Sequence, residues 1–276
     1  MHSGDYVSGE YIRIEPNIRL NIRDWGKGKA IVFIPGWPLG HEMFEYQFTA
    51  LSRLGFRCIG VTMRGFGRSS KPWGEYNYDV FAEDIEKVLD ALNLHDITLA
   101  GHSMGGAIAL HYTATHKSKR VSKLALFGAA TPSFTKRPGF PHGLEPAAVD
   151  DLIGLCEADR AKLGENFGKI FFKSEKSVSP KLAEWFHDMG MEASPLATAA
   201  CLAALRDTDL REEMKLVKVP TAIFHSTLDK ICPFELAEAT AAGIKGSKLT
   251  RFENSGHGLF YEERDKFNRE LVDFIG

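Results

Sequence analysis

The sequence predicts an α/β fold in which helices cover both faces of a mostly parallel, eight-stranded sheet. Short, continuous apolar runs such as residues 30–34 are typical of strands buried on both faces, as in a parallel sheet. Longer stretches with helical periodicity, such as 78–92, separate these runs, so strand and helix alternate along the chain. A chain of 276 residues is also long enough to bury a sizeable core.

The predicted strands begin with an antiparallel hairpin. Segments 11–14 and 18–23 alternate apolar and polar residues, and the turn-forming pair Pro16-Asn17 joins them. The six further predicted strands are 30–34, 56–61, 97–100, 124–127, 221–225 and 249–252. The predicted helices between and after them are 43–54, 78–92, 105–116, 234–242 and 260–275.

One long interruption breaks the alternation between Thr131 and Val219. Strand patterns are missing there, and three stretches have helical periodicity, namely 147–163, 180–191 and 195–205. Breaks in the pattern separate them at Gly164, Ser179-Pro180 and Ser194-Pro195. We therefore predict a core domain of residues 1–131 and 219–276 and a helical cap of residues 132–218. Such an insertion would lie over the carboxyl edge of the sheet, where open α/β folds bind ligands.

Composition and charge exclude several classes of partner. The formal net charge is -2, and the densest basic cluster is better suited to capping a helix and lining a solvated loop than to binding nucleic acid. That cluster consists of Lys117, Lys119, Arg120 and Lys123. No stretch approaches the roughly 18 apolar residues of a membrane span, so no membrane partner is predicted.

The chain start and the cysteines predict a cytoplasmic protein. Residues 1–5 lack the basic and apolar regions of a signal peptide. The four cysteines lie far apart and form no Cys-x-x-Cys pair, so we predict that they are reduced and structural. They are Cys58, Cys156, Cys201 and Cys232.

The pentapeptide from Gly101 to Gly105 places Ser103 between a predicted strand and a predicted helix. A chance match to Gly-x-Ser-x-Gly in such a chain has a probability on the order of 0.1, so the pattern alone is only suggestive. Its context makes it specific, because a sharp strand-to-helix turn lifts a serine hydroxyl above the sheet, and Gly105 and Gly106 permit close backbone packing. The sequence therefore predicts Ser103 as a nucleophile.

A serine nucleophile needs a base and an acid that orients the base. His257 lies on a glycine-flanked loop after the last predicted strand, and Asp229 is the first carboxylate after strand 221–225. The order Ser103, Asp229, His257 is one of those in which such triads occur. Glu235 is the rival acid, but it follows Pro233 and is better placed in the first turn of the next helix. His102, next to the nucleophile, is assigned a packing role.

Negative charge developing on a carbonyl oxygen needs fixed donors, for which we predict the backbone N–H groups of Trp37 and Met104. By itself, the segment around Trp37 would be an ordinary Pro-Gly turn. A second glycine-rich segment, 64–69, lacks the third glycine of a dinucleotide fingerprint; we expect a turn there, with Arg64 paired internally. The spacing of His225, Asp229 and His257 matches no common metal site, so no metal or other cofactor is predicted.

Together these residues resemble the α/β-hydrolase fold family and, more narrowly, the bacterial aryl esterase and cofactor-free haloperoxidase group, also called perhydrolases. The segments that carry the resemblance are 33–39, 44–47, 64–69, 101–106 and 229–234. The resemblance implies Ser103 as nucleophile, His257 as base, Asp229 as acid, and the Trp37 and Met104 amides as oxyanion hole. It also implies an apolar acyl pocket formed by Trp37, Phe134, Phe167, Phe171 and Ile231. Each of the aromatic side chains could equally belong to the hydrophobic core.

The chain departs from the family pattern at three places. Pro35 stands where the family usually has histidine, Thr62 where it has aspartate, and Ser226-Thr227 where it has Gly-Asp. These departures leave the predicted triad intact, but they prevent a direct transfer of substrate from family members.

Three functions remain open on the sequence. The first is hydrolysis of small, largely apolar carboxylic esters through an acyl-enzyme, with lactones and lactams as cyclic variants of the same chemistry. The second is perhydrolysis, in which peroxide replaces water; Pro38 keeps it open, since the resemblance associates a proline here with perhydrolases. The third is a non-catalytic ligand receptor on a hydrolase fold. The expected partner is a small-molecule ester, and the oligomeric state, a homo-oligomer included, stays open.

Overall fold

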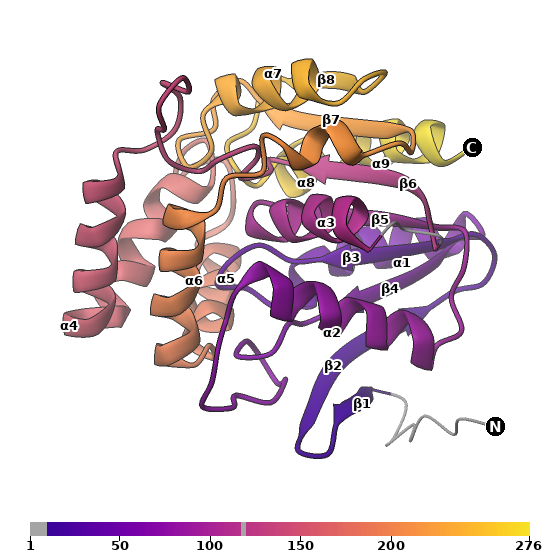
Figure 1. Ribbon diagram of the computed structural model, residues 1–276, viewed down its shortest axis with the longest axis horizontal. Helices are drawn as coiled ribbons and strands as arrows, with labels where there is room; N and C mark the ends of the chain where they lie inside the picture. The colour runs from indigo at the N-terminus through magenta and orange to yellow at the C-terminus, as the bar shows by residue number, and fades with distance from the viewer. Residues whose placement is uncertain (1–9, 117–119) are drawn as a thin grey trace.

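The computed structural model describes residues 10–116 and 120–276 (Figure 1). The chain start and two members of the basic cluster, Lys117 and Lys119, lie outside the described residues. Of the other two members, Lys123 caps the end of a helix, as predicted, whereas Arg120 is paired with carboxylates and does not line a solvated loop. Lys123 Nζ donates to the carbonyl oxygens of Phe274 and Ile275 at the end of a helix, at 2.8 and 2.7 Å, and Arg120 pairs with carboxylates of a neighbouring helix.

The structure contains the predicted eight-stranded, mostly parallel sheet, with strand order β1-β2-β4-β3-β5-β6-β7-β8. β1 and β2 form the predicted antiparallel hairpin, and the six strands from β3 to β8 are parallel. The strands are β1 (Tyr11–Glu15), β2 (Ile18–Trp25), β3 (Ala30–Ile34), β4 (Arg57–Val61), β5 (Ile97–His102), β6 (Val121–Phe127), β7 (Thr221–Ser226) and β8 (Lys248–Phe252). β6 begins three residues before its predicted start, because Val121 pairs with Ile97 although the polar Ser122 and Lys123 interrupt the apolar pattern.

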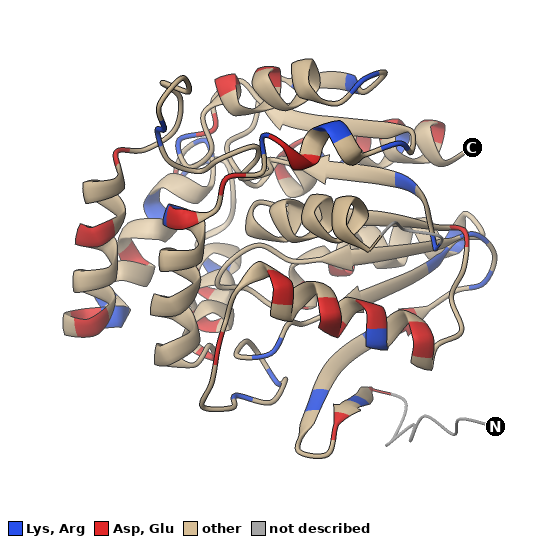
Figure 2. Ribbon diagram, in the orientation of Figure 1, with Lys and Arg blue, Asp and Glu red and all other residues tan. Residues whose placement is uncertain are grey.

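Helices cover both faces of this sheet, as predicted (Figure 1). α2 (Tyr78–Ala91) and α3 (Met104–Thr115) pack together on one face, and α1 (Glu45–Arg53) and α9 (Arg264–Ile275) pack together on the other. α3 contains no Lys, Arg, Asp or Glu and is buried along most of its length (Figure 2). Further helical segments are η1 (His41–Phe44), η2 (Glu213–Leu216), α7 (Phe234–Gly243) and α8 (Leu259–Glu262).

Two predicted helices are each divided in the structure. The predicted helix 43–54 consists of the 3-10 turn η1 followed by α1. The predicted helix 260–275 is broken at Glu263, whose backbone is not helical (φ -116°, ψ 43°), into α8 and α9. The Glu263 carboxylate accepts hydrogen bonds from the Asn254 amide and the Ser255 hydroxyl, and these contacts hold the break in place.

Between β6 and β7 the chain forms the predicted helices, which lie together at one end of the sheet (Figure 1). They are α4 (Pro146–Phe171), α5 (Pro180–Met191) and α6 (Pro195–Asp207). The prediction that Gly164 ends the first of them is wrong, since α4 continues to Phe171 and is broken instead at Asp159 (φ -155°, ψ 84°). Asp159 Oδ1 accepts the Lys162 N–H at 2.9 Å and so starts the second half of α4. The division of the chain into core and cap at residues 132 and 218 stays a prediction.

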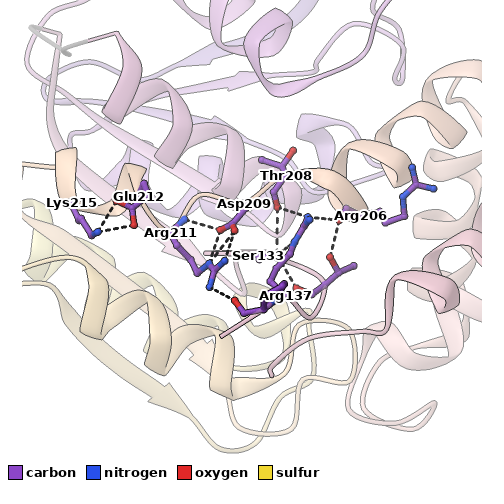
Figure 3. Close-up of polar contacts among 10 residues, drawn as sticks. Ser133, Arg137, Arg206, Thr208, Asp209, Arg211, Glu212 and Lys215 are labelled. Atoms are coloured by element: carbon purple, nitrogen blue, oxygen red, sulfur yellow. Dashed lines mark hydrogen bonds and ion pairs between the residues drawn. The ribbon is translucent and has the colours of Figure 1, made fainter. Parts of the chain in front are cut away.

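Arginine side chains tie the beginning of this inserted segment to its end (Figure 3). Arg137 donates to the carbonyl oxygens of Arg206 and Thr208, at 2.5 and 3.3 Å. Arg211 pairs with Asp209 and donates to the carbonyl oxygen of Pro138 at 3.0 Å. The chain therefore leaves and re-enters the sheet region through one hydrogen-bonded cluster.

The glycine-rich segment 64–69 is a turn, as predicted. Arg64 is paired internally: its Nε donates to Asp84 Oδ2 at 2.6 Å, and its guanidinium also contacts Glu15 at 2.9 Å. Gly65 has φ +88°, a conformation that favours glycine. No helix within residues 10–116 and 120–276 combines the length and the apolar character needed to cross a membrane.

A buried histidine makes the stability of this fold depend on pH. His41 is 1% exposed; its Nδ1 lies 2.8 Å from the Thr62 hydroxyl, and its Nε2 has no hydrogen-bond partner. Burial lowers the pKa of His41 from 6.5 to about 4. The unfolded chain therefore binds a proton at a higher pH than the folded protein does, and the free energy of unfolding falls as the pH falls from 6.5 toward 4.

We expect His41→Gln to flatten this pH dependence by up to about 1.4 kcal/mol per pH unit, since glutamine does not titrate but still reaches Thr62. Urea unfolding at pH 7, 6 and 5 measures the change. Burial also lowers the pKa values of His102 and His225, so part of the slope remains in the variant. His95→Gln, at an exposed site, is the control. Parallel slopes for the wild type and His41→Gln would show that His41 is not the titrating group.

Candidate active site

Ser103 lies at a sharp turn between β5 and α3, as the pentapeptide predicts. Its backbone has φ 54° and ψ -122°, an unusual conformation for a residue with a side chain. Glycines make the turn sterically feasible, since a Cβ on Gly101 would lie 2.2 Å from the carbonyl oxygen of Gly105. A Cβ on Gly105 would in turn lie 2.4 Å from the carbonyl oxygen of Ile34. The turn therefore presents the serine beyond the end of the sheet.

Asp229 and His257 are brought together by the loops that follow β7 and β8. His257 Nδ1 lies 2.6 Å from Asp229 Oδ2, and both side chains are fully buried. Asp229 Oδ1 accepts the N–H groups of Ile231 and Cys232 at 2.8 and 2.9 Å. Burial would raise the pKa of Asp229, but the facing His257 ring and these hydrogen bonds lower it below its usual value, so the carboxylate is ionised.

Ser103 is not hydrogen-bonded to His257 in this structure. His257 Nε2 is buried and has no hydrogen-bond partner among the described residues. The thiol of Cys232 instead lies near the Ser103 hydroxyl, and burial raises the pKa of this thiol well above its usual value. The same loop thus supplies Asp229 and a neutral thiol next to Ser103.

Further contacts fix the His257 loop, and the sequence analysis missed them. The Ser226 hydroxyl at the end of β7 donates to the carbonyl oxygen of Ser255. Glu262 accepts the Gly256 N–H at 2.7 Å, and the Gly258 N–H donates to the carbonyl oxygen of Phe171 at 3.1 Å. The sequence did offer one signal for these contacts, because the carboxylates of residues 262 and 263 follow the candidate base within six residues.

The predicted oxyanion donors are free to bind a ligand. Among the described residues, neither the Trp37 N–H nor the Met104 N–H is a donor in any hydrogen bond. The loop carrying Trp37 passes close to Ser103, since a Cβ on Gly36 would lie 3.0 Å from the Ser103 Cβ. The indole N–H of Trp37 donates to the carbonyl oxygen of Thr198 at 3.0 Å, which fixes the ring.

This sheet, with a serine turn after β5 and an acid and a histidine after β7 and β8, matches one family of proteins. The family model described as "alpha/beta hydrolase fold" matches residues 29–264. The chain belongs to this family. The narrower resemblance to its esterase and haloperoxidase group is confirmed by the relatives that follow.

Three proteins are similar to this hydrolase in sequence, and two of them have solved structures similar to it. The AB hydrolase superfamily protein YisY of Bacillus subtilis is 49% identical over 96% of this chain and 98% of its own length. The structure of an esterase from Exiguobacterium antarcticum is 42% identical, with a TM-score of 0.94 over 97% of this chain and 99% of that chain. A bromoperoxidase from Bacillus anthracis is 34% identical, with a TM-score of 0.93 over the same shares.

The hydrolase has a cavity of about 140 Å³ at Ser103, which we call the main cavity. Four of the five predicted pocket residues line it, namely Trp37, Phe134, Phe167 and Ile231. Phe171 does not. Its ring packs edge-on against His257, with centroids 5.4 Å apart, and lines a neighbouring cavity. Phe171 ends α4, where it also contacts the His257 loop, so it lies behind the histidine instead of in front of the serine.

His102 and the four cysteines of the hydrolase are buried. His102 is buried between Phe44, Phe171 and Phe260, and its Nε2 lies 3.0 Å from the carbonyl oxygen of His257. All four cysteines are buried and unpaired, as predicted. In the part of the chain that the structure describes, no three His, Cys, Asp or Glu side chains are grouped as a metal ion would require.

Proposed function

We propose that this hydrolase cleaves small, largely apolar carboxylic esters through an acyl-enzyme formed on Ser103. The observation that carries the proposal is the position of Ser103, at a strained turn on the wall of an apolar cavity and next to the loops that hold the Asp229–His257 pair. The similarity to an esterase at 42% identity supports the same reaction. Neither a metal nor an organic cofactor is required for it.

The proposed first step transfers the Ser103 proton to His257 Nε2 while the serine oxygen attacks the ester carbonyl. For this the Ser103 hydroxyl turns toward the unpartnered Nε2 of His257. Asp229 holds the imidazole in the tautomer that carries its proton on Nδ1 and stabilises the imidazolium that forms. The free N–H groups of Trp37 and Met104 would stabilise the oxyanion of the tetrahedral intermediate.

In the second step the intermediate collapses, the bond to the alcohol breaks, and His257 returns the proton to the departing oxygen. Water then attacks the acyl-enzyme with His257 as base, which releases the acid and restores Ser103. A lactone or lactam would follow the same steps, with the leaving group remaining attached to the acyl group.

The size and lining of the main cavity support small apolar acyl groups. A cavity of about 150 Å³ lined by aliphatic and aromatic side chains can hold a benzene molecule, and the main cavity has a similar size. Among the described residues that line it, the polar side chains besides Ser103 are Asn166 and Lys230; most of the others are apolar. A compact hydrocarbon group is therefore the best match.

Perhydrolysis is the second candidate, and the 34% identity to a bromoperoxidase favours it. In this reaction hydrogen peroxide attacks the same acyl-enzyme in place of water, so that a peracid and not a carboxylic acid is released. The two reactions share Ser103, His257 and Asp229 and differ only in the acyl acceptor.

One experiment tests both candidates. The protein is mixed with 4-nitrophenyl acetate and quenched early, and mass spectrometry is used to look for one acetyl group on the peptide that contains Ser103. Acetic and peracetic acid are then measured with and without peroxide. Acetylation with acetic acid as the main product supports the esterase, and peracetic acid as the main product in peroxide supports the perhydrolase. Tight ester binding without acetylation would instead support a non-catalytic receptor.

A further inference from the structure

Three neighbouring cavities share lining residues, beginning with the main cavity at Ser103. The main cavity shares Trp37, Leu163 and Phe167 with a second cavity of about 40 Å³. The second cavity in turn shares residues with a groove of about 510 Å³ between α4 and α5; these are Gly164, Gly168, Phe172, Ala183 and His187. We call the second cavity and the groove together the side passage.

Two aromatic rings separate the main cavity from the side passage. The rings of Trp37 and Phe167 meet edge to face, with centroids 5.2 Å apart and planes at 87°. Trp37 is fixed from behind by the hydrogen bond from its indole N–H to Thr198. Phe167 has no such anchor, is only partly buried, and otherwise contacts the ring of Phe171 at 5.6 Å. Of the two rings that separate the cavities, the Phe167 ring is therefore the one that is free to change its rotamer.

Glycines on α4 form the side passage. Gly164 and Gly168 are one helical turn apart and line both the second cavity and the groove. A Cβ built on Gly168 would meet no atom within 4 Å, so a larger side chain has room there. The second cavity is mainly apolar, and its one arginine, Arg160, already donates to the carbonyl oxygens of Gly190 and Met191 at 3.4 and 3.2 Å.

We propose that Phe167 sets the upper limit on the length of the acyl chain by closing the side passage to the main cavity. An unbranched apolar chain is the occupant that the second cavity fits, because its walls offer hydrocarbon contacts and its one arginine is already hydrogen-bonded. Charged side chains such as Lys169 and Glu184 line only the outer groove. The proposal rests on the proposed esterase function for the reaction itself. It goes beyond that function in naming the residue that decides which acyl lengths are accepted.

The test is the ratio of kcat/KM for 4-nitrophenyl decanoate to that for 4-nitrophenyl acetate. We expect Phe167→Ala to raise this ratio at least about tenfold, since several methylene groups gain apolar contacts once the passage opens. Phe167→Leu should give a smaller increase in the same direction. Adding Gly168→Leu to Phe167→Ala should remove the gain by filling the passage.

Gly154→Leu, added to Phe167→Ala, is the matched control. Gly154 lies on the same helix, is exposed, and would also meet no atom within 4 Å on gaining a Cβ, but it lines none of the three cavities. The control should keep the full gain. An unchanged ratio in Phe167→Ala, or a gain that survives Gly168→Leu, would overturn the proposal.

A binding measurement separates this proposal from the esterase function. In proteins that also carry Ser103→Ala, calorimetry is used to measure the affinity for decanoate, which needs no turnover. Phe167→Ala should strengthen decanoate binding, and Gly168→Leu should reverse the effect. If no ester is hydrolysed but decanoate binding changes in this way, the proposed esterase function is wrong and the proposed role of Phe167 in closing the side passage is supported. If the affinity for decanoate is unchanged in Phe167→Ala, the proposed role of Phe167 is wrong.

Discussion

Ser103→Ala is expected to lower the hydrolysis of 4-nitrophenyl acetate by about 10⁴-fold or more, because no other group takes over the attack on the carbonyl. The substitution removes one oxygen at a turn whose backbone the glycines hold, so the variant should fold. The neighbouring thiol of Cys232 is unsuited to replace the serine, since burial keeps it protonated. Initial rates under substrate saturation, together with the circular dichroism of both proteins, measure the effect.

Ser122→Ala is the control for this experiment. Ser122→Ala likewise removes one hydroxyl oxygen, which here donates to the carbonyl oxygen of Ile97, but Ser122 lies at the start of β6, away from the main cavity. Its rate should stay within about twofold of the wild type. A folded Ser103→Ala protein with near-wild-type activity would remove the serine mechanism, and a loss of only tenfold would also count against it.

Asp229→Asn should lower kcat by about 10⁴-fold with little change in KM. Asparagine can keep the bonds from the Ile231 and Cys232 amides on its oxygen, but its NH₂ group would then face His257 Nδ1. The imidazole would be held in the wrong tautomer, with no lone pair on Nε2 for the Ser103 proton. Steady-state kinetics with 4-nitrophenyl acetate measure this loss.

Glu235→Gln makes the corresponding change at the rival carboxylate. Glu235 is exposed in the first turn of α7, and no hydrogen bond joins it to His257 in the described chain. We expect this variant to keep most of the wild-type activity. A benign Asp229→Asn with an inactive Glu235→Gln would mean that the acid has been assigned to the wrong residue.

The sheet was predictable because its strands are short apolar runs, separated by segments whose apolar residues recur with helical periodicity. The errors lie where a contact of a side chain, and not the local sequence pattern, decides where a helix begins or ends. Gly164 was expected to end a helix, but the carboxylate of Asp159 starts a new helical segment before it, and tertiary packing carries this segment through the glycine. Nothing in the local sequence distinguishes Asp159 from the other acidic residues of α4.

The candidate acid and base were predictable from their positions after successive strands. Asp229 and His257 could be chosen because each follows a predicted strand at the same edge of the sheet, and the structure brings them to 2.6 Å. Contacts across the fold were not predictable in this way. Neither the approach of Cys232 to Ser103 nor the position of Phe171 behind His257 depends on local spacing, because both follow from how α4 and the loop after β7 pack in three dimensions.

The contact between the end of α4 and the His257 loop limits how this chain can be re-engineered. A Cβ on Gly256 would lie only 2.5 Å from the backbone nitrogen of Lys173, and Phe171 accepts a hydrogen bond from the same loop. The inserted helices are therefore not an exchangeable module. A graft that lengthens or shortens α4 would displace the histidine together with the cavity wall, so any swap meant to change selectivity must keep residues 171–173 in place.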